Sequence, residues 1–316
     1  MAASISRFAN ERLADPGTLR APPPGEISGY LAWARQQSGL VRAAQAAFYA
    51  EGGGCMNVEK KTGLRAWRWR QEFEPGRLGW LVNPFYFARQ GLLAGLKEFF
   101  PQLRGEVLDV GCGSKPYRAM IPATRYVGLE YDTPRARASF AADAYYDGRT
   151  FPFADGSFDA VLCSQVFEHV FTPEEFLREI HRVLRPGGVL VLTVPFVWDE
   201  HEQPHDFARY SSFGLKALLE RAGFVVEAQR KSTADSRVLA QLLNAYFYKI
   251  THGENRALNW LAMLGLMAPV NFLGIVLGRV LPGNDDLYLD NIVLARKRSS
   301  AGGVPASGSP TERTEG

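Results

Sequence analysis

Short apolar runs alternate with amphipathic helical stretches between residue 105 and about residue 230. The runs of strand length stand at 107–110, 126–130, 160–164, 189–194 and 224–228. One helical stretch, 173–184, begins at Pro173 after Thr172, and another runs from 211 to 222. Thr172 with Glu175 three residues later predicts a capping box. Because strands and helices alternate, the pattern predicts an α/β fold in which helices cover both faces of a parallel sheet.

The flanks of this region have other patterns. Residues 1–26 end in a proline-rich run and predict a flexible N-terminal segment. Helical periodicity at 27–49 and 85–100 predicts a helical N-terminal extension over 27–100. The α/β domain would then occupy 101–298, and the Ser-, Gly- and Pro-rich residues 299–316 predict a disordered tail.

An apolar stretch interrupts the domain before its last strand, within a helical insertion predicted at about 234–284. No residue of 257–278 is ionisable, and this length could span a membrane, which needs about 20 apolar residues. A single crossing would, however, separate two strands of one sheet. Pro269 and Asn271 predict two short helices that lie at a membrane surface, beside a basic aromatic patch at 60–70. The alternative is a helical hairpin that caps the sheet or forms a homodimer contact.

Composition narrows the class of protein. Of 316 residues, 36 are Lys or Arg and 33 are Asp or Glu, so the net charge of +3 is too small to favour a nucleic-acid partner. The three cysteines form no CxxC pair, which argues against a disulfide scaffold or a zinc site, and the sequence predicts no metal. The first residues lack an apolar signal run, so the expected location is the cytoplasm, with peripheral membrane binding through the apolar stretch.

A glycine turn follows the first predicted strand. The strand ends at Asp109-Val-Gly111-Cys-Gly113, and the next strand ends at Glu130. Glycines let the backbone approach a ligand closely, and a carboxylate on the neighbouring strand can accept hydrogen bonds from a ribose diol. Pro116 stands where a dinucleotide-binding fingerprint has its third glycine, which argues against a pyrophosphate cradle. The pattern predicts a nucleoside pocket.

Residues 106–231 resemble a class I S-adenosylmethionine-dependent methyltransferase of the methyltransferase type 11 family. Four segments carry the resemblance in order and spacing: VLDVGCG at 107–113, VGLE at 127–130, FPFADGSFDAVL at 151–162 and REIHRVLRPGG at 178–188. The resemblance implies a Rossmann-like seven-stranded sheet, with 289–295 as the final strand, and S-adenosyl-L-methionine as cofactor.

The resemblance also implies roles for individual residues. Gly111 and Gly113 would pass beneath the cofactor, and Asp109 would orient this loop or reach the methionine ammonium. Glu130 would bind the ribose hydroxyls. Asp143, with Ala144 beside it, would accept from the adenine amino group. Gln165 would lie near the methionine part.

The methyl acceptor is predicted to bind at the loop after the strand 189–194. This loop, 195–210, is rich in titratable groups, and an imidazole near neutral pH suits removal of a hydroxyl proton. His205 with Asp206 is the first candidate for the base, and His201 is the second. An equal alternative is that the loop only folds over the cofactor.

The motif Pro-His-Asp-Phe-x-Arg-Tyr at 204–210 resembles that of enzymes of bacterial surface-polysaccharide pathways. The resemblance implies O-methylation of a glycan or a lipid-linked acceptor. Quinone, lipid or RNA acceptors remain alternatives. So does a catalytically silent methyltransferase-like binding module.

Overall fold

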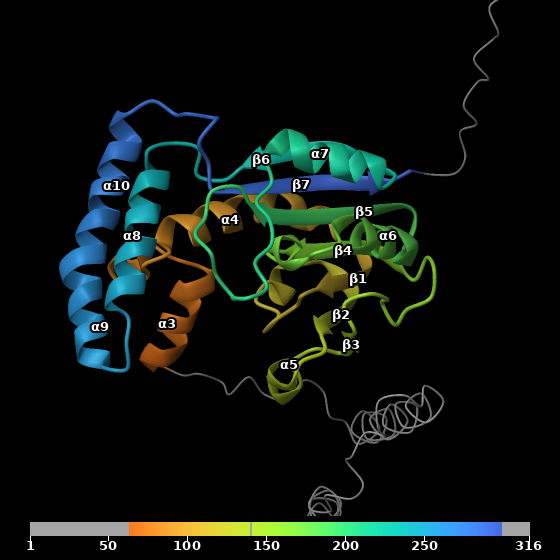
Figure 1. The fold of residues 1–316 in the computed structure, drawn as a ribbon, viewed down its shortest axis with the longest axis horizontal. Coiled ribbons are helices and arrows are strands. Elements are labelled where there is room, and N and C mark those ends of the chain that lie inside the picture. Colours follow the sequence, from red (N-terminus) through yellow and green to blue (C-terminus); the bar gives the residue numbers. More distant parts are fainter. Residues whose placement is uncertain (1–62, 140, 299–316) are drawn as a thin grey trace, which may run out of the picture. The chain divides into compact units, whose positions relative to one another are not determined.

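The computed structural model describes residues 63–139 and 141–298, which belong to one compact unit, 59–316. The predictions for 1–26, for the helix at 27–49, for the start of the patch 60–70 and for the tail 299–316 lie outside these residues. The described residues contain a seven-stranded sheet in the order β3-β2-β1-β4-β5-β7-β6 (Figure 1). The strands are β1 Gly105–Val110, β2 Ala123–Tyr131, β3 Ala144–Tyr146, β4 Phe158–Ser164, β5 Leu184–Pro195, β6 Phe224–Lys231 and β7 Asp290–Lys297. β7 runs antiparallel to β5 and β6, and the other pairings are parallel. The predicted Rossmann-like seven-stranded sheet is confirmed.

Side chains of the central strands point alternately into two cores, one on each face of the sheet. On one face Leu108 and Val110 pack with α6, Pro173–Val183, and α7, Ser212–Arg221. On the other face Val107 packs with α4, Tyr86–Phe99. Burial on both faces explains why these strands are continuously apolar in sequence. Because α4 covers the sheet itself, it is part of the α/β domain, whereas the sequence assigned it to a separate extension.

The two main helix starts differ in their capping. Ser211 caps α7, because its hydroxyl accepts a hydrogen bond from the Gly214 backbone amide. Thr172 precedes α6 but makes no such bond, and Glu175 lies beside Arg178. The predicted capping box is therefore wrong, although Pro173 does begin the helix. The remaining helices before the insertion are α3, Gly63–Phe73, and α5, Pro134–Ser139.

The insertion between β6 and β7 is a helical hairpin. α8, Arg237–Thr251, is followed by α9, Arg256–Ala262, a π-helical turn at Met263–Met267, and α10, Ala268–Val280. These last three pieces form one helix of 25 residues, so the prediction of two separate short helices is wrong. Pro269 lies inside this helix, two residues after the π turn, in which the backbone hydrogen bonds already depart from the α-helical pattern. Pro269 has no backbone N–H to donate, so the helix lacks one hydrogen bond where the π turn ends.

Asn271 holds the hairpin to the rest of the domain. Its side chain is fully buried, and its amide nitrogen donates to the carbonyl oxygens of Trp80, at 2.8 Å, and Asn83, at 3.1 Å. Its side-chain oxygen accepts from Asn244 of α8 at 2.9 Å. A residue that the sequence suggested as a helix breaker is thus a buried connector between two helices and the segment before α4.

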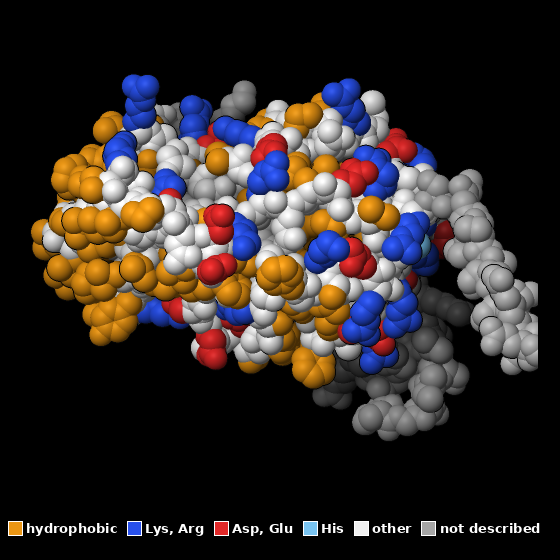
Figure 2. Space-filling view, turned by 90° about the horizontal axis from the view of Figure 1, so that it is seen from above, with side chains coloured by type: hydrophobic (Ala, Val, Ile, Leu, Met, Phe, Trp, Pro, Cys, Tyr) orange, Lys and Arg blue, Asp and Glu red, His pale blue; other side chains and the backbone are white. Residues whose placement is uncertain are grey.

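The outer face of the hairpin is apolar. Among the described residues, the helix Arg256–Val280 is long and apolar enough to cross a membrane, with a mean hydropathy of 2.0, and 28% of its most apolar window is buried. Hydrophobic side chains gather at the end of the molecule formed by α8, α9 and α10 (Figure 2). The exposed large residues are Leu239, Leu243, Tyr246, Ile250, Leu258, Trp260, Leu261, Leu264, Leu266, Phe272, Leu273, Val276 and Val280. We call this set the apolar face.

Candidate cofactor and acceptor site

The glycine turn lies at the carboxyl end of β1, between β2 and β4. Gly111 and Gly113 have φ values of +69° and +49°, in the region that favours glycine. A Cβ on Gly111 would lie 2.2 Å from Val166 Cγ2, whereas a Cβ on Gly113 would meet nothing within 4 Å. Gly111 therefore packs against the segment after β4, and Gly113 faces open space. In a parallel sheet, ligands bind at this point, where the strand order reverses.

Glu130 meets this turn as predicted. Its Oε2 accepts a hydrogen bond of 2.9 Å from the Gly113 backbone amide. The Gly111 amide in turn donates to the Leu129 carbonyl at 2.8 Å, which ties the turn to β2. A carboxylate is thus fixed at the edge of the open glycine surface. A carboxylate in this place can accept hydrogen bonds from a ribose diol, and this role of Glu130 stays a prediction.

Asp143 is held by two donors. Its Oδ2 accepts from the Gly128 backbone amide at 2.7 Å and from Lys115 Nζ at 2.6 Å. Ala144 follows directly and begins β3, where it pairs with Leu129. Both residues therefore lie beside the carboxyl end of β2, and their adenine-binding role stays a prediction. Lys115, for which the sequence predicted no role, has a φ of +53° and brings positive charge to this edge.

Asp109 is buried beneath the turn. Its Oδ2 accepts a hydrogen bond of 2.5 Å from the Tyr126 hydroxyl. Burial raises the pKa of this carboxyl to about 7, although the Tyr126 bond and the nearby Lys115 charge oppose that shift. A buried carboxyl with such a pKa can take up or release a proton when a charged ligand binds. Tyr126 lies in β2 and could not be recognised from spacing alone.

Gln165 lies next to the glycine turn, because its neighbour Val166 contacts Gly111. Its own side-chain amide donates to Thr193 Oγ1 at 3.2 Å and to Asp290 Oδ1 at 3.3 Å. Burial raises the pKa of Asp290 to about 6, and Ser232 donates a hydrogen bond of 2.6 Å to it. Gln165 is thus anchored to the ends of β5 and β7, and its contact with a methionine moiety stays a prediction.

In the loop after β5, Asp206 contacts His201, whereas the sequence suggested His205 as its partner. Asp206 accepts from Arg209 at 2.6 and 2.7 Å and from the His201 backbone amide at 2.9 Å, and its Oδ2 lies 3.3 Å from His201 Nδ1. The Arg209 bonds lower the pKa of Asp206 to about 2. His205 is exposed, and its ring lies against Phe207. Asp206 thus contacts His201 and Arg209, and the catalytic role of His205 stays a prediction.

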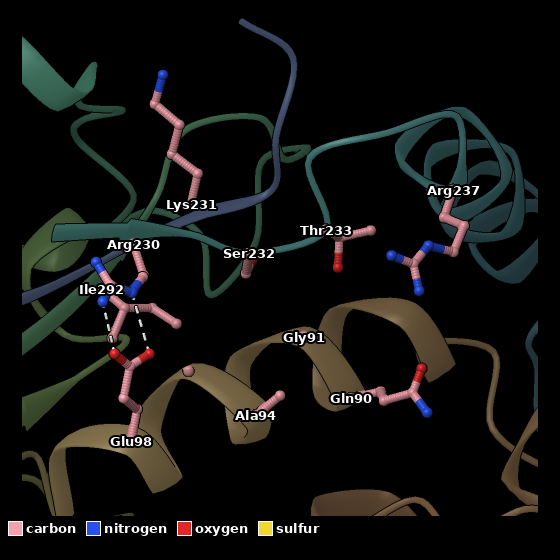
Figure 3. Close-up of a pocket in the computed structure, with 11 residues that line it drawn as sticks. Gln90, Gly91, Ala94, Glu98, Arg230, Lys231, Ser232, Thr233, Arg237 and Ile292 are labelled. Carbon is pink, nitrogen blue, oxygen red and sulfur yellow. Dashed lines mark hydrogen bonds and ion pairs between the residues drawn. The ribbon is translucent and has the colours of Figure 1, made fainter. Parts of the chain in front are cut away.

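A groove of about 570 Å³ lies elsewhere, between α4 and the ends of β6 and β7 (Figure 3). Arg230 and Lys231 contribute positive charge to it, and Glu98 bonds Arg230 at 2.6 and 3.0 Å. None of the predicted cofactor residues lines this groove. β6 is the edge strand farthest from β2 and β3, so the groove is not the site at the glycine turn.

Comparison with known proteins identifies the region around the turn. The profile of a methyltransferase domain family matches residues 108–192. A protein of Mycolicibacterium smegmatis, named as a probable S-adenosylmethionine-dependent methyltransferase, is 34% identical over 135 residues, which are 39% of this chain and 52% of that protein. An uncharacterized methyltransferase of Mycobacterium sp. (strain JLS) is 42% identical over 99 residues, 29% of this chain and 39% of that protein. The matched part of this chain thus spans about half or less of the length of these relatives.

Solved structures with a similar chain path include a phosphoethanolamine N-methyltransferase 2 of Haemonchus contortus. It is 16% identical, has a TM-score of 0.45, and the match covers 77% of this chain and 59% of that one. A methyltransferase of Mesorhizobium loti is also 16% identical, with a TM-score of 0.43, and the match covers 67% of this chain and all of that one. The family profile and the sequence relatives agree: residues 108–192 of this chain form a methyltransferase domain, similar to that of a protein named as a probable S-adenosylmethionine-dependent methyltransferase.

Proposed function

We propose that this chain is an S-adenosylmethionine-dependent methyltransferase. The observation that carries the proposal is the Glu130 carboxylate bonded to the Gly113 amide at the edge of the open glycine turn. The residues present fit this cofactor. Glu130 can accept from the ribose diol, Gly113 leaves room for close approach, and Asp109 supplies a carboxyl that can ionise opposite a cation. When bound, S-adenosylmethionine supplies an electrophilic methyl group on a sulfonium.

We further propose that the acceptor is a hydroxyl of a lipid-linked glycan. The loop that carries His201 contacts the hairpin directly, because Lys249 of α8 donates to the Glu200 carbonyl at 2.6 Å and lies 2.8 Å from an Asp199 carboxylate oxygen. Phe85 packs on Trp198 of this loop and on Tyr248 of α8. The loop after β5 and the hairpin that bears the apolar face are therefore in direct contact. An acceptor with an apolar anchor and a polar head would suit this arrangement.

We propose that the apolar face binds the membrane surface and does not cross the bilayer. Its long helix lies between β6 and β7, which pair in one sheet, so both helix ends return to the same folded domain. Arg256 and Arg279 flank the apolar stretch and can reach lipid headgroups. Peripheral binding would bring lipid-linked acceptors to the neighbouring loop.

The acceptor class is tested with the full-length protein, methyl-labelled cofactor and three separate fractions: lipid-linked glycans, free glycans and RNA. We expect label in the lipid-linked fraction. The Glu130→Ala variant is the control and should transfer no label. Label confined to RNA or to free glycans would contradict the proposed acceptor, and absence of label from every fraction would favour a silent binding module.

A further inference from the structure

Glu168 is a buried carboxylate without a hydrogen-bond partner among the described residues. It follows β4, in a short 3-10 turn at Phe167–His169, and its side chain has no exposed surface. Neither Oε1 nor Oε2 has a hydrogen-bond partner in the described part of the chain. Its backbone carbonyl accepts from the amides of Phe207 and Ala208, which holds it beneath the loop after β5. A buried carboxylate left in this way is costly unless a proton or a cation compensates its charge.

Two imidazoles face this carboxylate. His169 Nε2 lies 3.8 Å and His201 Nε2 lies 3.9 Å from Glu168 Oε1. These separations are too long for hydrogen bonds. They suit a shared cation, because ligand atoms that are each roughly 2.0–2.2 Å from one ion lie further apart from one another than hydrogen-bonded atoms do. One ligand atom from each of the three residues lies within 4.8 Å of the others.

The other nitrogen of each imidazole is fixed by an acceptor. His169 Nδ1 lies 2.7 Å from the His205 carbonyl oxygen, which can only accept, so Nδ1 carries the proton and Nε2 presents its lone pair. His201 Nδ1 lies 3.3 Å from Asp206 Oδ2, and Arg209 holds that carboxylate with two bonds. A carbonyl or carboxylate on Nδ1 that directs Nε2 toward an ion is the usual support of metal-binding histidines.

We propose that Glu168, His169 and His201 bind one divalent transition-metal ion. Two imidazoles and one carboxylate suit Zn²⁺ or Mn²⁺ and leave coordination positions open. The sequence predicted no metal here, because Glu168 and His201 are 33 positions apart and only the fold brings them together. In this account His201 is a ligand and not the catalytic base.

The ion gives the proposed methyl transfer a way to activate its acceptor, a role that rests on the proposed function. An acceptor hydroxyl bound at an open position would lose its proton to water more readily, because a divalent cation stabilises the alkoxide. The alkoxide oxygen then forms the new C–O bond as the C–S bond of the cofactor breaks, and S-adenosylhomocysteine leaves as a neutral thioether. Glu168, His169 and His201 lie after β4 and β5, at the sheet edge where the glycine turn also lies.

The test uses the full-length protein after removal of metal by a chelator and dialysis. Zn²⁺ and Mn²⁺ are titrated separately by calorimetry, and bound metal is counted by elemental analysis. We expect one saturable site in the wild type and about tenfold or weaker binding in Glu168→Gln and His201→Ala. The matched control is His252→Ala, which removes an exposed histidine at the end of α8 and should bind like the wild type.

Two further measurements keep the outcomes separate. Affinity for S-adenosylhomocysteine, measured on the same proteins, should be unchanged in all variants, so loss of metal with retained cofactor binding supports the site and shows that the fold is intact. Co²⁺ added to the wild type should give d–d absorption bands that change in His169→Ala. Wild type without saturable binding of any of the three ions, or Glu168→Gln binding like the wild type, would overturn the proposal.

Discussion

At the scale of single residues, burial controls the charge of Asp109. The carboxyl is buried beneath the glycine turn and accepts a hydrogen bond from the Tyr126 hydroxyl. Burial raises its pKa to about 7, so the apo protein carries a proton there over much of the acidic range. An arriving cation favours the ionised form.

This pKa predicts a pH dependence of stability. Between about pH 4 and pH 7 the folded state binds more protons at Asp109 than the unfolded state does, so the free energy of unfolding should fall as the pH rises through this window. Asp109→Asn should lose this part of the dependence. Urea unfolding of both proteins at several pH values measures it. A difference between the two proteins that stays constant from pH 4 to pH 7 would contradict the assignment.

The residues of the candidate cofactor edge could be predicted from the sequence, and the contacts within the loop after β5 could not. Gly111, Gly113 and Glu130 end neighbouring parallel strands, and topology alone brings such positions together. The partner of Asp206 depends on the path of an irregular loop, so the sequence chose His205 where the structure has His201. No residue pattern pointed to Glu168, because burial without a hydrogen-bond partner among the described residues is not visible in a sequence.

At the scale of elements, the strands could be predicted from the sequence, whereas the shape of the hairpin could not. The apolar runs located five central and edge strands because burial leaves a continuous apolar pattern. Pro269 and Asn271 suggested a break in the apolar stretch, yet a π turn precedes the proline and the asparagine is buried. Helix continuity here depends on tertiary contacts that local residue preferences do not encode.

The hairpin should depend strongly on Asn271. In Asn271→Leu, the carbonyls of Trp80 and Asn83 and the side-chain amide of Asn244 each lose one buried hydrogen bond, so the free energy of unfolding should fall by about 2 kcal/mol or more. Chemical denaturation measures this change. Asn259→Ala is the control, because its side chain bonds only the exposed Gly253 backbone. Equal losses in the two variants would show that Asn271 does not anchor the hairpin.

At the scale of the whole molecule, one end is apolar and the opposite part of the domain carries the mixed charges of an ordinary surface (Figure 2). The net charge of +3 is small, so binding to a membrane would depend mainly on apolar contact, with the flanking arginines adding a modest electrostatic part. The candidate cofactor edge lies at the carboxyl ends of the parallel strands. The loop after β5 begins at this edge, and its Asp199 pairs with Lys249 of the hairpin that bears the apolar face.

This arrangement predicts vesicle binding. The full-length protein should sediment with vesicles of phosphatidylcholine and phosphatidylglycerol, and a variant carrying Leu261→Asp and Phe272→Asp should bind at least about tenfold more weakly. Phe213→Asp on α7 is the control, because this exposed phenylalanine lies outside the apolar face. Wild-type protein that stays in the supernatant, or equal binding by all three proteins, would contradict membrane association.

Whether Glu130 binds the ribose of the cofactor is tested by the affinity for S-adenosylhomocysteine, measured by calorimetry in Glu130→Ala and in Glu98→Ala. Glu98 is the matched acidic control, since it lines the groove beside α4 and pairs with Arg230. Glu130→Ala should weaken binding by about tenfold or more, because the carboxylate acceptor for the ribose is gone, and Glu98→Ala should bind like the wild type. Unchanged affinity in Glu130→Ala, or a loss confined to Glu98→Ala, would contradict this role of Glu130.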